Sequence, residues 1–523
     1  MKYIPLNDDK KFSEQSIRAL LITLSVGVLW LFFSPESVPA ESVKRPNIIV
    51  IMADDLGYGD LSCYGATEIE TPNIDRLARE GQLFRQGYCS ASTCTPTRFS
   101  FLTGMYAFRQ QGTGIAPPNA TALIQPGTPT IASILDEAGY ETAVIGKWHL
   151  GLGEGKEPDW NGDLKPGPCE IGFDHCYLLP TTNDRVPQVY VDDHRVVNLD
   201  PKDPLWVGNK NPDGQPTGLT HRDTLKMDWS HGHNQTIHNG ISRIGFYSGG
   251  HAARWRDEDL ADKWVSHSAK WIETHKDNPF FLFFSSHDIH VPRMPHERFQ
   301  KKSKLGYRGD AILELDWQVG EVLTTLDRLD LTEKTLVIFC SDNGPVLDDG
   351  YVDGAVTQLG KHTPSGPFRG GKYSAYEGGT CTPFLTRWPG TIPAGESQAI
   401  VNTVDLATSM AELVKQPIPK EAFPDSLNVL DALLGKPYSV GRTETVEQGT
   451  SALGLRVGDW KLVAYRNKKN NGKTFEKTSE GLYELYQLDQ DPGESNNVIN
   501  KFPEKAQELI KRLEEIKAAP TRN

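Results

Sequence analysis

The chain has 523 residues, of which 38% are hydrophobic and 24% are charged, a composition typical of a globular protein with more than one core. Its 68 acidic and 55 basic residues give a formal net charge of −13 at pH 7. That balance argues against a nucleic-acid-binding protein, which would carry a basic surface. It leaves an anionic substrate open, because cations can cluster locally on an acidic protein.

The N-terminus is typical of an export signal. Basic residues precede an apolar run over 19–33, and Val38 and Ala40 are placed as a cleavage site requires. The run is shorter than a membrane-spanning helix needs. We therefore predict a signal peptide over 1–40, with an uncleaved anchor as the alternative. Export would deliver the protein to the periplasm, the cell surface or the medium.

A buried strand is predicted after this leader. Residues 48–53 are continuously apolar, as in a central parallel strand that is covered on both faces. Asp54 and Asp55 follow directly, at the end of the strand where open α/β sheets form their sites. Either carboxylate could simply cap a turn, but two adjacent ones favour a site for a hard cation.

A compact cassette follows at Cys94, with Pro96 two residues on and Arg98 two further. A Cys is a strong nucleophile as a thiolate. Arg98 offers a fork of donors that suits a tetrahedral oxyanion such as sulfate or phosphate. Because Pro96 fixes the backbone, we expect a turn after Cys94 and a helix that begins at about Arg98. The alternative is a buried Cys at a helix start, with Arg98 in an ordinary ion pair.

Seven cysteines are present, and in an exported protein an odd count suggests one thiol with a separate fate. Cys94 is the natural candidate. Cys169 and Cys176 are close enough in the sequence to pair across a short loop, although the connectivity cannot be deduced. No Cys and His spacing matches a zinc site.

Strands and helices alternate over most of the chain. Helices are predicted over 71–81, 128–138, 257–275 and 311–329, and strands over 142–146, 279–286 and 335–341. This order predicts an α/β fold, a doubly wound and mainly parallel sheet with helices on both faces. Residues 151–254 are loop-rich, and we expect this insert to shape a substrate pocket.

The character of the chain changes near residue 440. Residues 453–465 alternate like an antiparallel hairpin with a Gly-Asp turn, a strand follows over 482–488, and 503–517 form an amphipathic helix. We therefore predict a catalytic domain over 44–440 and a smaller C-terminal α+β subdomain with an antiparallel sheet over 441–523.

Further polar residues follow the predicted strands or lie in nearby loops. Each has an ordinary explanation alone, such as a core histidine or a solvated lysine. Collected at one sheet edge, they would form a cation site of oxygen ligands ringed by positive charge, which suits a dianionic group. They are Lys147, His149, His290, Asp342, Asn343 and Lys372.

These motifs together resemble the type I, formylglycine-dependent sulfatases of the alkaline-phosphatase superfamily, the family of the arylsulfatases and the N-acetylgalactosamine-6-sulfatases. Residues 94–98 and 102–104 match the family's Cys-x-Pro-Ser/Thr-Arg…Leu-Thr-Gly signature, with Thr at 97 where Ser is commoner. Residues 146–151 match its second signature. Residues 342–344 and 371–379 match further blocks, and the matches keep the family's order.

The resemblance implies that a formylglycine-generating maturase oxidises Cys94 to Cα-formylglycine during export. A hydroxyl of the hydrated aldehyde, activated on Ca²⁺, would then attack sulfur. An all-oxygen ligand set with three carboxylates suits that hard cation. The implied calcium ligands are Asp54, Asp55, Asp342, Asn343 and the modified Cys94.

The other roles are also implied by the resemblance. Arg98 would hold the hydrated aldehyde. Lys147, His290 and Lys372 would bind the sulfate oxygens, and His290 or Lys372 would assist the departing alcohol. His149 would take a proton from the second hydroxyl, which expels sulfate and regenerates the aldehyde, whereas a serine ester has no second hydroxyl with which to collapse.

Two assignments keep alternatives at this point. The family pattern favours His290 over His287, because Pro292 follows His290 after one residue. Some residues of the insert are expected to contact the sugar or the leaving group, with solvated loop residues as the alternative. These are Asp184, Arg185, His231 and His233.

We therefore expect an exported, calcium-dependent sulfuric-ester hydrolase with a sulfated glycan or an aryl sulfate as substrate and no nucleic-acid partner. One alternative is a phosphomonoesterase or phosphodiesterase of the same superfamily, although those enzymes typically use Ser or Thr with two zinc ions. The other is a catalytically silent glycan-binding homologue, which would not need the whole set of polar residues. By resemblance, galactose or N-acetylgalactosamine sulfates are the expected substrates.

Overall fold

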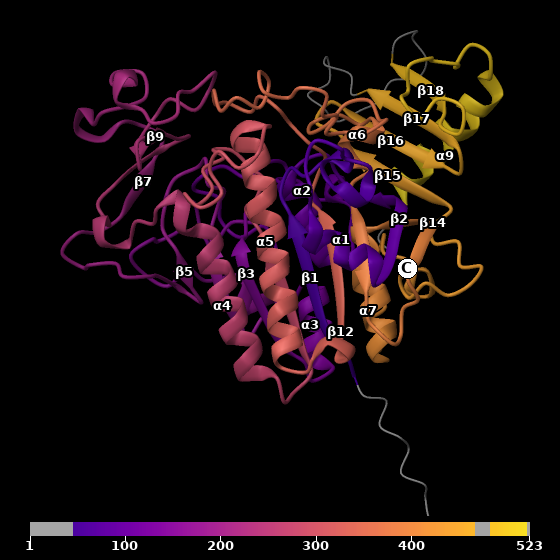
Figure 1. The fold of residues 1–523 in the computed structure, drawn as a ribbon, viewed down its shortest axis with the longest axis horizontal. Helices are drawn as coiled ribbons and strands as arrows, with labels where there is room; N and C mark the ends of the chain where they lie inside the picture. The colour runs from indigo at the N-terminus through magenta and orange to yellow at the C-terminus, as the bar shows by residue number, and fades with distance from the viewer. Residues whose placement is uncertain (1–44, 466–481, 520–523) are drawn as a thin grey trace, which may run out of the picture. The chain divides into compact units, whose positions relative to one another are not determined.

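A computed structural model of the protein describes residues 45–465 and 482–519 (Figure 1). The predicted signal peptide over 1–40 lies outside the described residues. Within them, no helix is both long and apolar enough to cross a membrane.

A ten-stranded sheet organises the fold, in the order β14-β2-β13-β12-β1-β11-β3-β4-β5-β6. The central strands β12, β1, β11, β3 and β4 are parallel, whereas β13, β5 and β6 pair antiparallel with their neighbours. The sheet is therefore mixed, with a parallel centre. Its strands are β1 Asn47–Ala53, β2 Gly81–Tyr88, β3 Glu141–Lys147, β4 His175–Leu179, β5 Val191–Asp192, β6 Arg195–Val196, β11 Phe280–Ser285, β12 Thr335–Ser341, β13 Phe384–Arg387 and β14 Gly395–Asn402.

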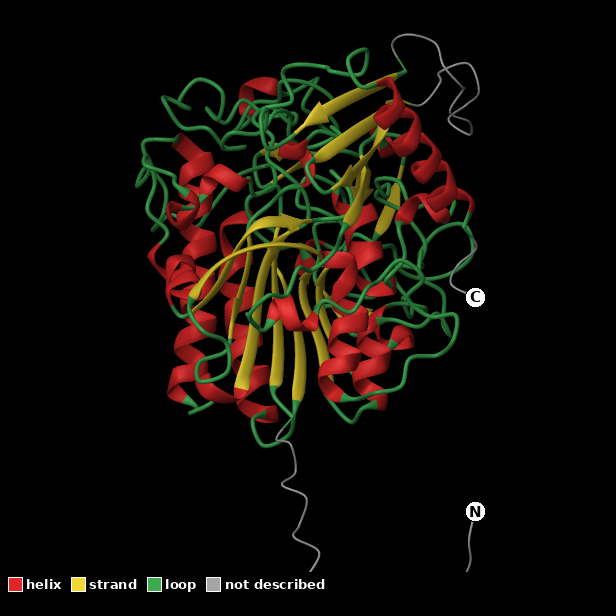
Figure 2. Ribbon diagram, turned by 90° about the vertical axis from the view of Figure 1, so that its right-hand side faces the viewer, coloured by secondary structure: helices red, strands yellow, loops and turns green. Residues whose placement is uncertain are grey.

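Strand β1 is buried along its whole length between β11 and β12, as its apolar run predicts. Its residues alternate between two apolar cores, one on each face of the sheet. Ile48, Val50 and Met52 pack in the core that also contains α2, α3, α7 and α8 residues. Ile49 and Ile51 pack in the core that contains α1, α4 and α5 residues. Figure 2 shows helices on both sides of the strands, which confirms the doubly wound α/β prediction.

The predicted helices are all present, with bounds that differ by up to five residues, but the sequence analysis did not predict α6, α7 and α8. Helix α5 begins five residues before the predicted residue 311, because Arg308 forms a buried pair with Asp60 (Nη2 to Oδ2, 2.6 Å) that anchors its first turn. The helices are α1 Pro72–Arg79, α2 Cys94–Thr103, α3 Ile131–Glu137, α4 Leu260–His275, α5 Gly306–Arg328, α6 Glu377–Thr380, α7 Leu406–Val414, α8 Leu430–Leu433 and α9 Pro503–Ala518.

Helix α2 begins at Cys94 rather than at about Arg98, so the predicted turn after Cys94 is wrong. Thr93 precedes the helix in an extended conformation. Pro96 lies in the first turn, where the N–H groups of a helix have no internal partner, so its missing donor is tolerated. The helix thus places Cys94 at its N-terminal end and Arg98 one turn later on the same side.

The insert over 151–254 is mostly loop, as predicted, but it also supplies β4 to the main sheet. The sequence prediction missed this strand because it is five residues long and sits among Gly- and Pro-rich loops. All seven cysteines lie in the described residues and none is in a disulfide there, so Cys169 and Cys176 are not joined. The remaining short strands are β7 Trp206–Gly208, β8 Ile237–His238, β9 Ile241–Ser242 and β10 Phe246–Ser248.

The predicted C-terminal hairpin is confirmed. Strands β15–β18 form an antiparallel four-stranded sheet, with Gly458 and Asp459 in the turn between β16 and β17. Helix α9 packs on this sheet through Leu509 and Leu513, and Figure 1 shows it beside the strands. The described residues from Arg45 onward form one compact unit, and the domain boundary at 440 stays a prediction. The strands are β15 Glu444–Gln448, β16 Ala452–Val457, β17 Trp460–Tyr465 and β18 Tyr483–Gln487.

Candidate functional site

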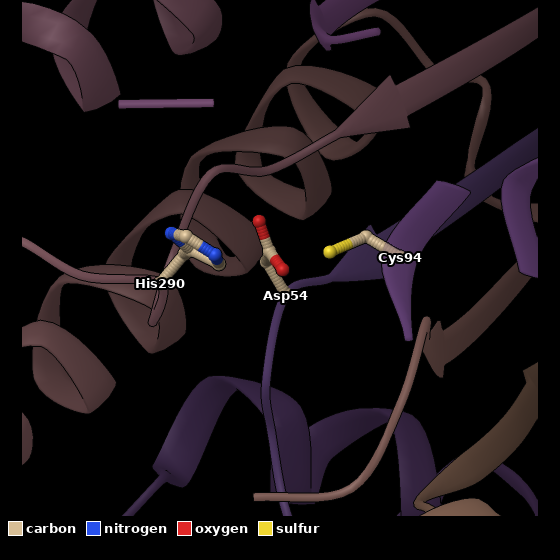
Figure 3. Close-up of side chains that lie close together, drawn as sticks. All are labelled: Asp54, Cys94 and His290. Atoms are coloured by element: carbon tan, nitrogen blue, oxygen red, sulfur yellow. The ribbon is translucent and has the colours of Figure 1, made fainter. Parts of the chain in front are cut away.

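The predicted site residues converge at the carboxyl end of the parallel strands. Asp54 and Asp55 follow β1, and Asp342 and Asn343 follow β12. The other site residues come from the ends of β3 and β11, the start of α2 and the loop before α6. Figure 3 shows Asp54 between Cys94 and His290, with the sulfur of Cys94 directed at Asp54. One ligand atom from each of these three residues lies within 4.8 Å of the others. The ten converging site residues are all buried. They are Asp54, Asp55, Cys94, Arg98, Lys147, His149, His290, Asp342, Asn343 and Lys372.

Four of these residues form a buried oxygen cluster. Asn343 Nδ2 donates to Asp55 Oδ1 at 2.7 Å, and the Asp55 N–H donates to Asp342 Oδ1 at 3.3 Å. Asp54 Oδ1 and Asn343 Oδ1 are buried and accept no hydrogen bond from the described residues. Burial, and next the charge of Asp342, raise the pKa of Asp54 well above its usual value. Orphaned oxygens and crowded carboxylates fit a hard cation such as Ca²⁺.

Three cations surround the oxygen cluster. Arg98 Nη2 lies 2.8 Å from Asp342 Oδ2, and Lys147 forms a salt bridge with Asp54. Lys372 Nζ lies 2.9 Å from Asp55 Oδ2. Burial alone would lower the pKa of Lys372, but Asp349 and Asp55 raise it well above its usual value. The side chains of Lys147 and Lys372 therefore bring ammonium groups to the place where an anionic substrate would meet the cluster.

The Cys94 thiol is poorly suited to act as a nucleophile itself. Its residue is only 2% exposed. Burial raises the pKa of this thiol to about 11, although Lys147 and Lys372 act in the opposite direction. The thiol is therefore protonated at neutral pH, where a nucleophilic cysteine would have to be a thiolate.

The two site histidines each have one ring nitrogen that carries no proton in the neutral imidazole. His149 Nε2 lies 3.0 Å from the carbonyl oxygen of Ala116, so this nitrogen donates, and the buried Nδ1 has no hydrogen-bond partner among the described residues. His290 Nδ1 lies 2.7 Å from the Val291 carbonyl oxygen, and its Nε2 lies 3.9 Å from Asp55 Oδ2. Burial, and next a neighbouring lysine, lower the pKa of both histidines well below the usual value.

The structure separates His287 from His290. His287 Nδ1 accepts a hydrogen bond from Trp264 Nε1 at 3.1 Å, within the core that α4 covers. His290 instead lies against Asp55 and lines a small recess beside Cys94.

This recess has a volume of about 60 Å³. On its insert side, His233 Nε2 and Arg185 Nη1 both lie 2.9 Å from Asp184 Oδ2. His231, the fourth predicted candidate of the insert, is not on the recess, because its side chain is 63% exposed and lies 3.7 Å from Asp348. The lining residues are Cys94, Ile115, Asp184, Arg185, His233, His290, Asp349, Lys372 and Tyr373.

Sequence reasoning missed two polar residues of the recess. Asp349 Oδ2 lies 2.8 Å from Lys372 Nζ, and its Oδ1 accepts a hydrogen bond from the Tyr373 hydroxyl at 2.7 Å. Asp349 lies in a loop without periodicity, seven residues after Asp342. The one available signal was its position shortly after the 342–344 block. Tyr373 could have been found as the residue that follows Lys372.

Comparison with known proteins agrees with this geometry. A family model described as "Sulfatase" matches residues 46–416, and one described as "N-sulphoglucosamine sulphohydrolase, C-terminal" matches residues 371–519. Over 487 residues, the chain is 48% identical to the N-acetylgalactosamine-6-O-sulfatase of Bacteroides thetaiotaomicron. The aligned region covers 91% of this chain and 94% of that protein. The chain is also 28% identical over 526 residues to arylsulfatase A of Homo sapiens. That aligned region covers 95% of this chain and 90% of the human protein.

A solved structure agrees as well. It comes from work on the metabolism of multiple glycosaminoglycans by Bacteroides thetaiotaomicron and superimposes with a TM-score of 0.87 at 48% identity. The match covers 91% of this chain and 100% of that chain.

Proposed function

The chain belongs to the sulfatase family, and from that premise we propose that it hydrolyses the sulfate ester of a sulfated carbohydrate and releases inorganic sulfate. The observation that carries this proposal is the position of Cys94, which lines the recess together with Lys372 and lies beside Asp54 of the oxygen cluster. A sulfate monoester, which carries one negative charge, or the dianionic sulfate product would find positive charge on several sides there. The signal peptide predicted over 1–40 would lead to export, which would bring the enzyme to extracellular glycans.

Two groups would complete the site. Asp54, Asp55, Asp342 and Asn343 would hold Ca²⁺, which would supply positive charge for the sulfate and the nucleophile when bound. A maturase would convert Cys94 to Cα-formylglycine, which would supply, once hydrated, one hydroxyl for attack and a second for clearing the sulfate ester. The protonated state of the Cys94 thiol supports its role as a precursor.

The chain's own residues would act around these groups. Lys147 and Lys372 would bind sulfate oxygens through their ammonium groups. Arg98 would fix Asp342, whose Oδ2 already accepts a hydrogen bond from Arg98 Nε at 3.0 Å. His149 Nδ1 would accept the proton of the second hydroxyl, since Nε2 is engaged with a carbonyl. His290 and Lys372 line the recess from which the alcohol would depart.

We place the sugar against the insert side of the recess. Asp184, Arg185 and His233 bring an acceptor and donors to this wall, which is the composition that sugar hydroxyls require. The 48% identical relative is an N-acetylgalactosamine-6-O-sulfatase. We therefore propose the 6-O-sulfate of N-acetylgalactosamine or galactose as the substrate group.

The function is tested by comparing two esters of the same sugar. We expect the purified protein to release sulfate from N-acetylgalactosamine 6-sulfate at least about 100-fold faster than phosphate from the 6-phosphate. Both groups are tetrahedral, but the phosphate ester carries a second negative charge beside the three carboxylates of the oxygen cluster. Ion chromatography measures both products. Faster phosphate release would favour the phosphatase alternative. Release of neither ion, tested across several sulfated sugars, would favour a silent glycan-binding homologue.

The proposed sugar contact on the insert side of the recess is tested with the variant His233→Ala. We expect KM for N-acetylgalactosamine 6-sulfate to rise about tenfold, because a sugar contact is lost, while kcat/KM for a small aryl sulfate changes less than about twofold. His231→Ala is the matched control, since His231 is two residues away but exposed. Equal losses on both substrates would show that His233 is needed only for folding of the recess.

A further inference from the structure

A buried ion cluster joins the C-terminal sheet to the loop that carries Lys372. Lys461 of β17 extends its Nζ to within 2.8 Å of Glu377 Oε1 and 2.7 Å of Glu447 Oε2, and Glu494 Oε1 lies 3.7 Å away. The side chains of Lys461, Glu447 and Glu494 are fully buried, and that of Glu377 is 2% exposed. Lys461 does not line the recess, and none of its three ion-pair partners is a proposed metal ligand.

Glu377 connects the ion cluster to the loop that carries Lys372. It is the first residue of α6 and follows the Lys372 loop, which we define as residues 367–376. Its N–H donates to Glu494 Oε2 at 2.7 Å, and its carboxylate accepts a hydrogen bond from the Tyr88 hydroxyl. Burial alone would raise the pKa of Glu377, but Lys461 and Arg456 hold it below its usual value. Both the main chain and the side chain of Glu377 are therefore fixed.

The Lys372 loop has little freedom to move independently of Glu377. The Gly378 N–H donates to the Arg369 carbonyl at 2.8 Å, and the Lys372 N–H donates to the Pro345 carbonyl at 2.9 Å. The Gly344 N–H donates to Gly379 O at 2.8 Å, and a Cβ added at Gly344 would lie 1.9 Å from Gly378 O. A shift of Glu377 would therefore reach Lys372 and the segment next to Asn343.

A second set of contacts ties the same loop to the same sheet. The Arg369 guanidinium lies 3.9 Å from the centre of the Tyr376 ring, and Arg369 Nη1 donates to Glu494 O at 2.8 Å. The Tyr376 hydroxyl donates to Glu484 Oε2 of β18 at 2.7 Å. The Lys372 loop is thus held at both of its ends, by Glu484 of β18 and by Glu494 in the segment that follows this strand.

We propose that Lys461 is a positioning residue, which acts through Glu377 to set the place of Lys372 in the active site. Buried ion pairs are often no more stabilising than well-packed apolar residues of similar size, because the charges must leave water. The ion cluster would, however, fix one position of the Lys372 loop, which apolar packing would not do. This inference rests on the sulfate-binding role proposed above for Lys372.

Lys461→Met tests the inference, because it removes the ammonium group and keeps the length of the side chain. At a temperature well below the melting point of the variant, we expect kcat to fall about 30-fold and the inhibition constant of free sulfate to rise about tenfold, because Lys372 no longer meets the anion in place. Sulfate inhibition is measured directly on N-acetylgalactosamine 6-sulfate turnover. A loss of stability alone would not change it.

Two further variants keep the test decisive. Glu377→Gln retains a hydrogen-bonding group and is expected to fold, with smaller changes in the same two parameters, so it replaces Lys461→Met if that variant does not fold. Arg109→Met is the matched control. Arg109 pairs with Asp425 at 2.7 Å and donates to the Ile516 carbonyl of α9 at 2.9 Å, so it ties the C-terminal region without touching the Lys372 loop. We expect it to lower the melting temperature and to leave kcat and sulfate inhibition unchanged.

Lys372→Met separates this inference from the proposed function. If that variant keeps wild-type activity, the sulfate-binding role of Lys372 is wrong and the inference fails with it. If Lys372→Met is inactive while Glu377→Gln and Lys461→Met keep kcat and sulfate inhibition within about twofold of wild type, the function stands and the positioning role is overturned.

Discussion

Replacing Cys94 by alanine is expected to reduce sulfate release by about 10,000-fold, to a level set by binding and charge alone. Cys94 is the one thiol among the described residues that line the recess, and it stands beside Asp54 at the start of α2. Alanine removes the atom from which the nucleophile would be made and leaves the surrounding charges in place. Ion chromatography of sulfate released from N-acetylgalactosamine 6-sulfate measures the effect.

Two controls define what Cys94 becomes. Cys89→Ala alters another buried thiol in the same segment and is expected to keep activity within about threefold. Cys94→Ser offers a single hydroxyl, so we expect no steady turnover but a residue-94 peptide heavier by about 80 Da after exposure to substrate. In active wild-type protein the same peptide should carry an aldehyde. An unmodified Cys94 thiol in fully active protein would refute the proposed precursor role.

Asp342→Asn is expected to abolish calcium binding and to lower sulfate release by about 1,000-fold. Asp342 is central to the oxygen cluster, because its Oδ1 accepts a hydrogen bond from the Asp55 N–H while its Oδ2 pairs with Arg98. The amide removes one of three carboxylate charges and leaves Arg98 with only its longer ion pair, to Asp54 at 4.0 Å. Bound calcium per protein molecule, measured by atomic emission after dialysis, is the direct readout.

Thermal melting provides a readout of calcium that does not depend on activity. A ligand that binds only the folded state raises the melting temperature, so wild type should melt higher in Ca²⁺ than in a chelator, and Asp342→Asn should show no difference. Asp316→Asn is the matched control, since Asp316 is a buried acid that holds the start of α1 through the Ile74 N–H at 2.8 Å. Wild-type protein that carries no calcium and melts alike in both buffers would contradict the proposed metal site.

The parts of the fold that the sequence predicted share a physical cause. A central parallel strand must be apolar on both faces, so β1, β11 and β12 appear as continuous apolar runs. The polar residues that follow them mark the site, because parallel strands end at the same edge of the sheet. Asp54, Asp55, Asp342 and Asn343 are in this way placed together by topology alone.

The missed features depend on tertiary contacts that leave no local pattern. Strand β4 is recruited to the sheet edge by pairing with β3, not by its own five-residue sequence. The start of α2 was predicted at about Arg98 instead of Cys94, because a Pro can either lie in the first turn of a helix or interrupt a helix. Asp349 reaches the site only because Lys372, 23 residues away, folds back onto it.

The central position of β1 has a consequence for the order in which the protein is made and folded. Its two neighbours, β11 and β12, begin at Phe280 and Thr335, and the contact between Lys372 and Asp55 spans 317 residues. Folds with such distant contacts close slowly and late. Cys94 is buried in the folded protein, so the proposed maturase would have to act on a chain whose sheet has not yet closed. The topology that buries the thiol would in this way limit the time during which it can be converted.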